Sequence, residues 1–271
     1  MDLAKSSWHV LQADRELLWL PVMSLLASAA VFLSAAGLVF LADYDSSQGI
    51  DQLELSTGSI IIIVVAVFVV AVVNVFFNAA LVAGARDRLT GGHPTVSSAL
   101  ATAGARLPVI IPWAIFSTTV GMLLRALTES DNPMSRLVGS LLDMAWSVIT
   151  FLTVPILVVE ELGPFAALRR STELFKQTWG ENLAARVGLG IVGFLATLPG
   201  LLVGGLALAS GTAAVAIVGV GVAVVWIVGV IVVMSALTAV FQAALYQYVT
   251  TGEVPVAYVD NDLRTTFGPK G

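Results

Sequence analysis

The sequence predicts an all-α fold, a polytopic bundle of six transmembrane helices. Of the 271 residues, 58% are hydrophobic and only 11% are charged, whereas a soluble domain has about a quarter charged residues. Apolar runs recur that reach the roughly 20 residues a helix needs to cross a bilayer. Lipid offers the backbone no partners, so the spans must be helices. The run IIIIVVAVFVV at Ile60–Val70 also lacks the alternation of a barrel strand.

The apolar runs predict six spans in one membrane domain over residues 1–250, followed by a tail over 251–271. The first run starts after Glu16 and is too long for the core of a cleavable signal. The last run exceeds one crossing, so we expect it to tilt or to continue toward Tyr246 and Tyr248. The spans are Leu18–Ala42, Gly58–Ala83, Val109–Leu127, Leu137–Val159, Val187–Ala209 and Ala214–Ala244.

The basic residues predict the orientation. Eleven of the 13 Lys and Arg residues lie in the N-terminal segment, in the loops after spans two and four, and in the tail. The opposite side has only Arg125 and Arg136, beside several acidic residues. Because Lys and Arg in short loops remain on the cytoplasmic side, we expect both termini in the cytoplasm and the protein in the cell (plasma) membrane.

Cytoplasmic stretches with helical patterning precede spans one, three and five. We expect each to form an amphipathic helix on the membrane surface, so that an interfacial helix and a hairpin alternate three times. True sequence repeats are one explanation of this plan, and the need of any polytopic protein for re-entry helices is the other. The predicted apolar faces comprise Trp8 and Leu11; then Val96, Leu100, Ala103 and Leu107 after Pro94; then Phe165, Leu168, Thr172, Phe175 and Trp179 after Gly163-Pro164.

Asp143 is the main ionisable candidate inside the membrane, where charged groups are costly and usually paired or functional. It lies in span four, about 9 Å from the outer side at 1.5 Å per residue. Arg136 lies seven residues earlier on the same helical face, and Arg125 ends the preceding span. A structural ion pair at the outer interface and an ion or proton site are both open.

Amide side chains form a second polar group. Asn74 and Asn78 are four residues apart in span two and therefore share a face. We expect hydrogen bonds to a neighbouring helix, with a substrate-lining role as the alternative. Gln242 and Gln247 lie close enough to the inner end of span six to be solvated.

Pro155 should kink span four, because proline removes one bond of the helical ladder. Broken helices can mark transporter sites, although prolines are common in spans. Glu160 and Glu161 follow at the cytoplasmic end of the span, where negative charge opposes the helix dipole. We therefore expect them to pair with Arg169, Arg170 or Arg186.

Small residues predict close helix packing. Ala196, Gly200 and Gly204 form one strip in span five, and Ser24 and Ser28 form another in span one. Residues 188–193 match the glycine spacing of a dinucleotide fingerprint, but they lie inside a span and follow no strand. We interpret these glycines as positions where neighbouring helices approach closely.

The acidic loop Asp43–Glu54 resembles a twelve-residue calcium loop. Ligand types occur at positions 1, 3, 5, 9 and 12, from Asp43, Asp45, Ser47, Asp51 and Glu54. The glycine that such a loop needs at position 6 is replaced by Gln48, and Gly49 comes one residue late. A solvated acidic loop explains the charges without a metal, so we predict no metal site.

Three stretches of the chain resemble an uncharacterised prokaryotic family of six-span membrane proteins, a domain of unknown function. They are WHVLQADRELLWLPV, PTVSSALATAGARLPVIIPWAIFSTTVGMLL and WSVITFLTVPILVVEELGPFAALRRSTELFKQTWGENL. The run VPxLVxExxGPxxALxxS is the most specific part. There is a looser similarity to the membrane portion of glycerophosphoryl diester phosphodiesterases, without their catalytic domain. The resemblance implies the fold and carries no activity.

The residue content favours a non-catalytic role. The chain has no cysteine, and its two histidines, His9 and His93, lie in separate segments. No spacing of nucleophiles, paired carboxylates or metal ligands converges, so we predict no enzyme activity, catalytic residue or cofactor. We expect a scaffold or a subunit of a membrane assembly, with lipids and copies of itself or another membrane protein as partners, and no nucleic acid. The alternative is a transporter or channel for a small solute or ion.

Overall fold

The computed structural model describes residues 15–43, 55–177 and 179–252, and nearly all of them are helical. Among these residues there is no strand, which confirms the all-α prediction. The helices are η1 (Arg15–Leu18), α2 (Trp19–Asp43), α3 (Thr57–Leu89), α4 (Val96–Ala105), α5 (Leu107–Thr128), α6 (Pro133–Ile149), α7 (Thr153–Val159), α8 (Pro164–Gln177), α9 (Trp179–Ala209) and α10 (Ala213–Thr251).

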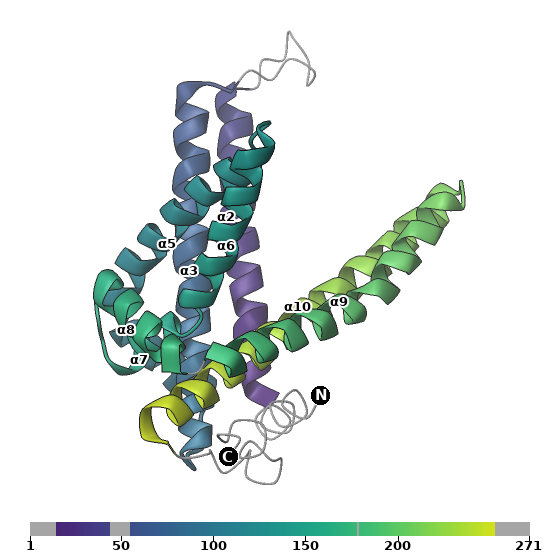
Figure 1. The fold of residues 1–271 in the computed structure, drawn as a ribbon. Coiled ribbons are helices and arrows are strands. Elements are labelled where there is room, and N and C mark those ends of the chain that lie inside the picture. Colours follow the sequence, from purple (N-terminus) through teal and green to yellow (C-terminus); the bar gives the residue numbers. More distant parts are fainter. Residues whose placement is uncertain (1–14, 44–54, 178, 253–271) are drawn as a thin grey trace.

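Six segments in the described ranges are long and apolar enough to cross a bilayer, as the sequence predicts, and the protein is a multi-pass membrane protein. Four of them lie within single helices, the first joins η1 to α2, and the fourth consists of α6 and α7 in succession. The 39 residues of α10 make it the longest helix described. At about 1.5 Å per residue it exceeds the thickness of a bilayer, and Figure 1 shows it running obliquely to α2 and α3.

Local polar residues explain where several helices begin. Ser56 caps α3 by accepting a hydrogen bond from the backbone N–H of Ser59. Thr95 and Ser98 form a reciprocal capping box at the start of α4, which satisfies two backbone donors at once. Asn132 caps α6, and proline occupies the first position of that helix, where its missing N–H is not needed.

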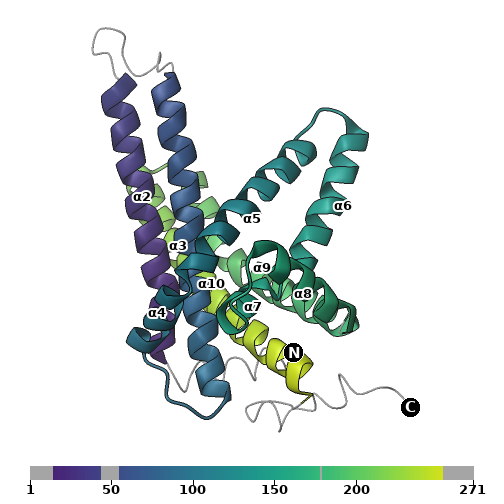
Figure 2. The ribbon, with the colours of Figure 1, turned by 90° about the vertical axis from the view of Figure 1, so that its left-hand side faces the viewer.

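The six long segments form three hairpins that diverge from a common base. Figures 1 and 2 show α2–α3, α5–α6 and α9–α10 spreading apart as they leave this base. We call the three hairpins the arms. We call the base the hub, and it consists of α4, α7, α8 and the adjoining ends of α2, α3, α5 and α10. This arrangement matches the predicted plan of three membrane hairpins.

The buried core lies in the hub. Buried residues in α3 concentrate between Ala79 and Leu89, and those in α10 between Val232 and Tyr246. They pack with α4, α7 and α8 into two apolar clusters. Toward the tips of the arms, large apolar side chains are exposed, such as Ile61 at 58% and Val225 at 74%. The arms therefore present apolar surface along most of their length, as expected of helices in lipid.

Helices α4 and α8 confirm two of the three predicted re-entry helices, and the predicted first one lies outside the described residues. The predicted face of α8 was incomplete. Its buried side chains are Ala167, Ser171 and Leu174, none of which belongs to the predicted face. Phe165, on the predicted face, is 73% exposed. On this side of α8, Ala167 and Leu174 pack against α7 within the hub.

Candidate functional site

The break in the fourth span lies at the centre of the hub. The backbone leaves α6 after Ile149 and resumes as α7 at Thr153. Pro155 explains the break, because it has no N–H to donate to Phe151 and its ring would crowd that carbonyl. The predicted kink is thus confirmed, and it is a complete interruption a few residues before the proline.

Side chains from other helices bind the carbonyls that the break leaves free. Gln242 in α10 donates from Nε2 to the carbonyl oxygen of Phe151, at 2.9 Å. Ser171 in α8 donates to the carbonyl oxygen of Ile149. These two donors replace the helical hydrogen bonds that are lost at the break. A buried carbonyl oxygen without any hydrogen bond would be strongly unfavourable. Gln242 is only 7% exposed, so the expectation that it is solvated was wrong.

Arg106, between α4 and α5, binds the other end of α7. Its Nε donates to the carbonyl oxygen of Val158 at 3.0 Å, and its Nη1 lies 2.6 Å from a carboxylate oxygen of Glu161. A carbonyl near a helix C-terminus carries partial negative charge, so a guanidinium there is favourable. Arg106 therefore fixes α7 against the loop that enters the third span.

Glu160 binds the last two elements of the hub together. Its Oε1 accepts hydrogen bonds from Arg170 in α8 at 3.2 Å and from the hydroxyl of Tyr246 in α10 at 2.9 Å. The predicted pairing with Arg170 is confirmed. Glu161 binds Arg106 instead of a predicted partner, because its backbone adopts a left-handed φ of 56° and the chain turns there.

Asp143 does not have its predicted partners. It is exposed on α6, and no hydrogen bond or ion pair joins it to Arg136 or to any other described residue. Arg125 pairs with Glu129, one turn along its own helix, at 2.8 Å. Of the two interpretations left open for Asp143, the ion pair with Arg136 or Arg125 is not formed among the described residues.

Asn74 and Asn78 lie in a different part of the structure from Asp143. They line a cavity of about 630 Å³ between α2, α3 and α10, together with Ser24, Ser28 and Thr238. Ser24 Oγ donates to Asn74 Oδ1 at 3.1 Å, so the predicted bond between helices is present for Asn74. Asp143 and Pro155 do not line this cavity. The residues on which the transport hypothesis rested are therefore not brought to one place.

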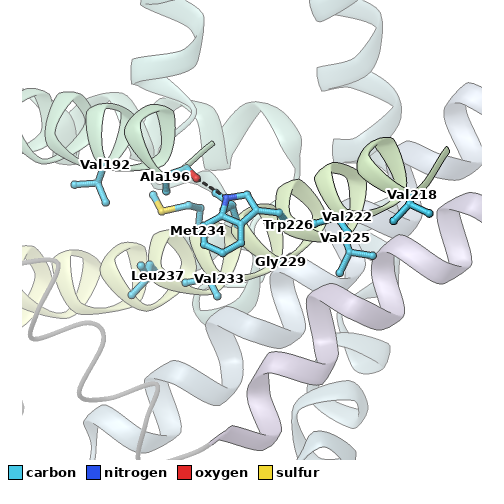
Figure 3. Close-up of a pocket in the computed structure, with 12 residues that line it drawn as sticks. Val192, Ala196, Val218, Val222, Val225, Trp226, Gly229, Val233, Met234 and Leu237 are labelled. Carbon is cyan, nitrogen blue, oxygen red and sulfur yellow. Dashed lines mark hydrogen bonds between the residues drawn. The ribbon is translucent and has the colours of Figure 1, made fainter. Parts of the chain in front are cut away.

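The third arm contains an apolar groove of about 820 Å³, lined by Val192, Ala196 and the valines of α10. Figure 3 shows Trp226 lying across it, with its indole N–H donating to the carbonyl oxygen of Ala196 at 2.8 Å. Gly200 explains this close approach, because a Cβ there would lie 2.8 Å from the Trp226 ring. The predicted small-residue contact in span five is thus confirmed.

Other sequence candidates fall partly or wholly outside the described residues. Of the acidic loop, only Asp43 is described, and its carboxylate accepts a hydrogen bond from the backbone N–H of Ser56 at 3.2 Å. His9 lies outside, and His93 is exposed beside Arg88. Of the glycines near residue 190, which lie within α9, Gly193 faces Met234 of α10 and Gly190 faces open space.

Sequence reasoning missed several hub residues. Ser171, Arg106 and Tyr246 drew no attention as ligands of the broken span. A signal for Gln242 was available, since a proline at position 155 predicts an unpaired carbonyl at position 151. The sequence does not indicate which polar side chain binds this carbonyl, because Gln242 is 91 residues away in sequence.

The comparisons with known proteins agree with the fold and add no activity. No curated protein and no solved structure matches the chain, and nothing supports the looser similarity to glycerophosphoryl diester phosphodiesterases. A family described only as being of unknown function matches residues 57–256, which include the broken span and five of the six spans. The chain therefore belongs to this family of unknown function, DUF6159.

Proposed function

We propose that this protein is a non-catalytic component of a membrane assembly, with its hub and both termini on the cytoplasmic side of the cell membrane. The orientation is supported by Arg86, Arg106 and Arg170, which belong to the hub. By the positive-inside rule such residues stay in the cytoplasm. A second copy of the chain is proposed as the partner, and α6 as the contact surface.

The proposed self-association rests on a polar stripe on α6. Arg136, Ser140, Asp143 and Ser147 recur at steps of three and four residues, and so lie on one face of the helix. The first three are exposed. A carboxylate facing hydrocarbon is expensive, so such residues pair within a bundle or across an interface. Because no described residue forms an ion pair with Asp143, this carboxylate needs a partner from outside the chain.

A second copy of α6 supplies suitable chemistry. Ser140 precedes Asp143 by about one turn, so a parallel copy crossing at this level brings a hydroxyl donor toward each carboxylate. Gly139 is buried against Leu127 and Thr128 of α5 and lies four residues before Asp143, so a partner helix would contact the stripe beside α5.

The absence of a catalytic centre is part of the proposal. Within the described ranges, no three His, Asp or Glu side chains lie close enough to hold a metal ion. Three carboxylates of the hub, Glu160, Glu161 and Glu173, are each bound to an arginine. These contacts support a structural role for the acidic residues.

The test uses the absence of native cysteine. The variant Ser140→Cys has a single cysteine on the stripe. Leu141→Cys is the matched control, because Leu141 is also exposed but lies off the stripe. In native membranes, oxidation should cross-link Ser140→Cys dimers much faster than Leu141→Cys dimers. Adding Asp143→Leu to the first variant should slow the cross-linking. A particle mass of one chain, with no cross-link, would contradict self-association.

The orientation is tested separately. An impermeant thiol label applied to intact cells should react with Thr212→Cys, in the turn between α9 and α10. It should not react with Thr250→Cys near the end of α10. Labelling of the second variant alone would invert the proposed orientation without affecting the cross-linking result.

Transport of a small solute is the second candidate, favoured by the polar cavity at Asn74 and Asn78. The polar lining does not continue toward the tips of the arms, since α3 has only apolar residues from 60 to 73. If transport occurs, proteoliposomes should take up a small polyol faster than protein-free vesicles, and Asn78→Leu should abolish the difference. Equal uptake would remove this candidate.

A further inference from the structure

The cavity between α2, α3 and α10 has polar residues at a depth where lipid would surround them. Each of the three helices contributes two such residues: Ser24 and Ser28, Asn74 and Asn78, and Ser235 and Thr238. Asn78 precedes Arg86 by eight residues, which places it about 12 Å along the helix from the charged end. Asn78, and Asn74 one turn farther from that end, are therefore expected inside the hydrocarbon layer.

Three of these six residues already form hydrogen bonds within the protein. Ser24 binds Asn74, the Asn74 amide donates to the carbonyl oxygen of Val70 at 2.9 Å, and Thr238 donates to the carbonyl oxygen of Met234 at 2.8 Å. These bonds fix the walls of the cavity. Such residues need no ligand.

Ser28 and Asn78 are different. Ser28 is only 9% exposed, and its Oγ is buried without a hydrogen-bond partner. The half-buried Asn78 amide also makes no hydrogen bond to any described residue, although it lines the same cavity. Polar groups at membrane depth that stay unpaired are strongly unfavourable. The Ser24–Asn74 hydrogen bond lies between them in the hairpin, so Ser28 and Asn78 offer groups that can donate and accept at two points of the cavity wall, about two helical turns apart.

The lining determines which charge a guest molecule can carry. None of the lining residues is charged, and an ionic group without a counter-charge would lose its hydration for no return. The guest is therefore uncharged. Leu25, Phe32 and Ile231 line the same cavity and are exposed, so the guest has an apolar part that contacts them.

The polar lining also ends inside the membrane, which distinguishes a binding site from a path. Toward the tip of the first arm, Ser34 is the only polar side chain of α2 between residues 29 and 42, and the neighbouring part of α3 is wholly apolar. Between residues 213 and 234 of α10, only Trp226 has a polar atom, and it is bound to Ala196. A guest therefore enters from the bilayer.

We propose that this cavity binds the uncharged, hydroxyl-bearing head of a lipid, through Ser28 and Asn78. The volume of about 630 Å³ suits a head with the first part of a tail, since ligand sites commonly measure roughly 300–1,000 Å³. Diacylglycerols and long-chain alcohols share this chemistry. The site is independent of self-association through α6, which uses another arm.

The experiment measures the unfolding temperature of the detergent-purified protein with added dioleoylglycerol, with oleyl alcohol, and with anionic phosphatidylglycerol. A saturable rise with either neutral lipid, absent with phosphatidylglycerol, supports the site, and the lipid that acts identifies the source. Ser28→Ala should weaken the apparent affinity about tenfold, the size of one good hydrogen bond. Ser34→Ala, which removes a hydroxyl from the same helix outside the cavity, should leave it unchanged.

Ser28→Ala has a second expected result that a purely structural role would not give. Without lipid, it should unfold at the same temperature as the parent or higher, because it removes an unpaired buried hydroxyl. No lipid-dependent shift, an equal shift with phosphatidylglycerol, or equal responses of parent and Ser28→Ala would overturn the proposal. So would efficient disulfide formation between two copies of Ser28→Cys, since a partner helix would then fill the cavity.

Discussion

The hub and the arms are held together by different forces. In the hub, Arg106, Gln242 and Glu160 join helices that are far apart in sequence through hydrogen bonds and ion pairs. The third arm depends mainly on close contacts between small residues, with one indole hydrogen bond. Between membrane helices the hydrophobic effect contributes little, because lipid tails are as apolar as leucine. Polar bonds therefore mark where this fold needs a fixed geometry.

The difference has a functional consequence. A break in a membrane helix is tolerated where neighbouring groups satisfy the freed backbone, and the hub provides them from three sides. The arms present apolar surface, and the hydrogen bonds described for the first and third arms lie within each arm. We infer that the hub keeps its shape while the spacing of the arms responds to lipids and partner helices.

The largest expected effect concerns two arginines, one in each region. Arg106→Gln should lower the free energy of unfolding by roughly 1.5–3 kcal/mol, because the Val158 carbonyl and Glu161 lose a charged partner. Arg125→Gln removes an exposed pair at the tip of the second arm, where the two side chains are 78% and 65% exposed. It should change stability by less than about 0.5 kcal/mol. Denaturation in mixed micelles measures both, and equal effects would remove the distinction between hub and arms.

The next effect tests the bond across the broken span. Gln242→Leu should lower the free energy of unfolding by roughly 1–2 kcal/mol, because the Phe151 carbonyl remains buried without a donor. Gln247→Leu, one and a half turns along the same helix, is the matched control. The Gln247 Oε1 is buried without a partner, so its loss should be neutral or stabilising. The same denaturation series reports both variants, and a reversed order would show that Gln242 does not satisfy the break.

The arms could be predicted from the sequence better than the hub. Continuous apolar runs determine a span almost alone, and the strip at Gly200 and Gly204 correctly indicated helix contact. The hub depends on pairings such as Tyr246 with Glu160, 86 residues apart. No local pattern records such a pairing, since either residue would look the same if it faced headgroups.

The candidate cavity shows the same limit. Asn74 and Asn78 were found because amides inside a span are unusual. Ser28 was read as a packing residue, because serine and alanine look alike in a small-residue strip. Only the crossing of α10 over the first arm brings Ser28 and Asn78 into one cavity. The isolated position of Asp143 was equally unpredictable, since its helical neighbour Arg136 looked like a sufficient partner.

The smallest expected effect tests the packing of an arm. A Cβ at Gly219 would overlap the Cβ of Ala207 in α9, whereas a Cβ at Gly221 would meet nothing within 4 Å. Gly219→Ala should therefore force α9 and α10 apart and lower the free energy of unfolding by about 1 kcal/mol, after the gain in helix propensity is included. Gly221→Ala has only the gain, and should be neutral or slightly stabilising. Because no polar bond of the hub is involved, the distance between spin labels on α4 and α8 should stay the same in both variants, while labels on α9 and α10 near Gly219 should move apart in the first. If Gly219→Ala disturbed the hub as much as the arm, the two regions would be one cooperative unit, and the independence argued for the arms would fail.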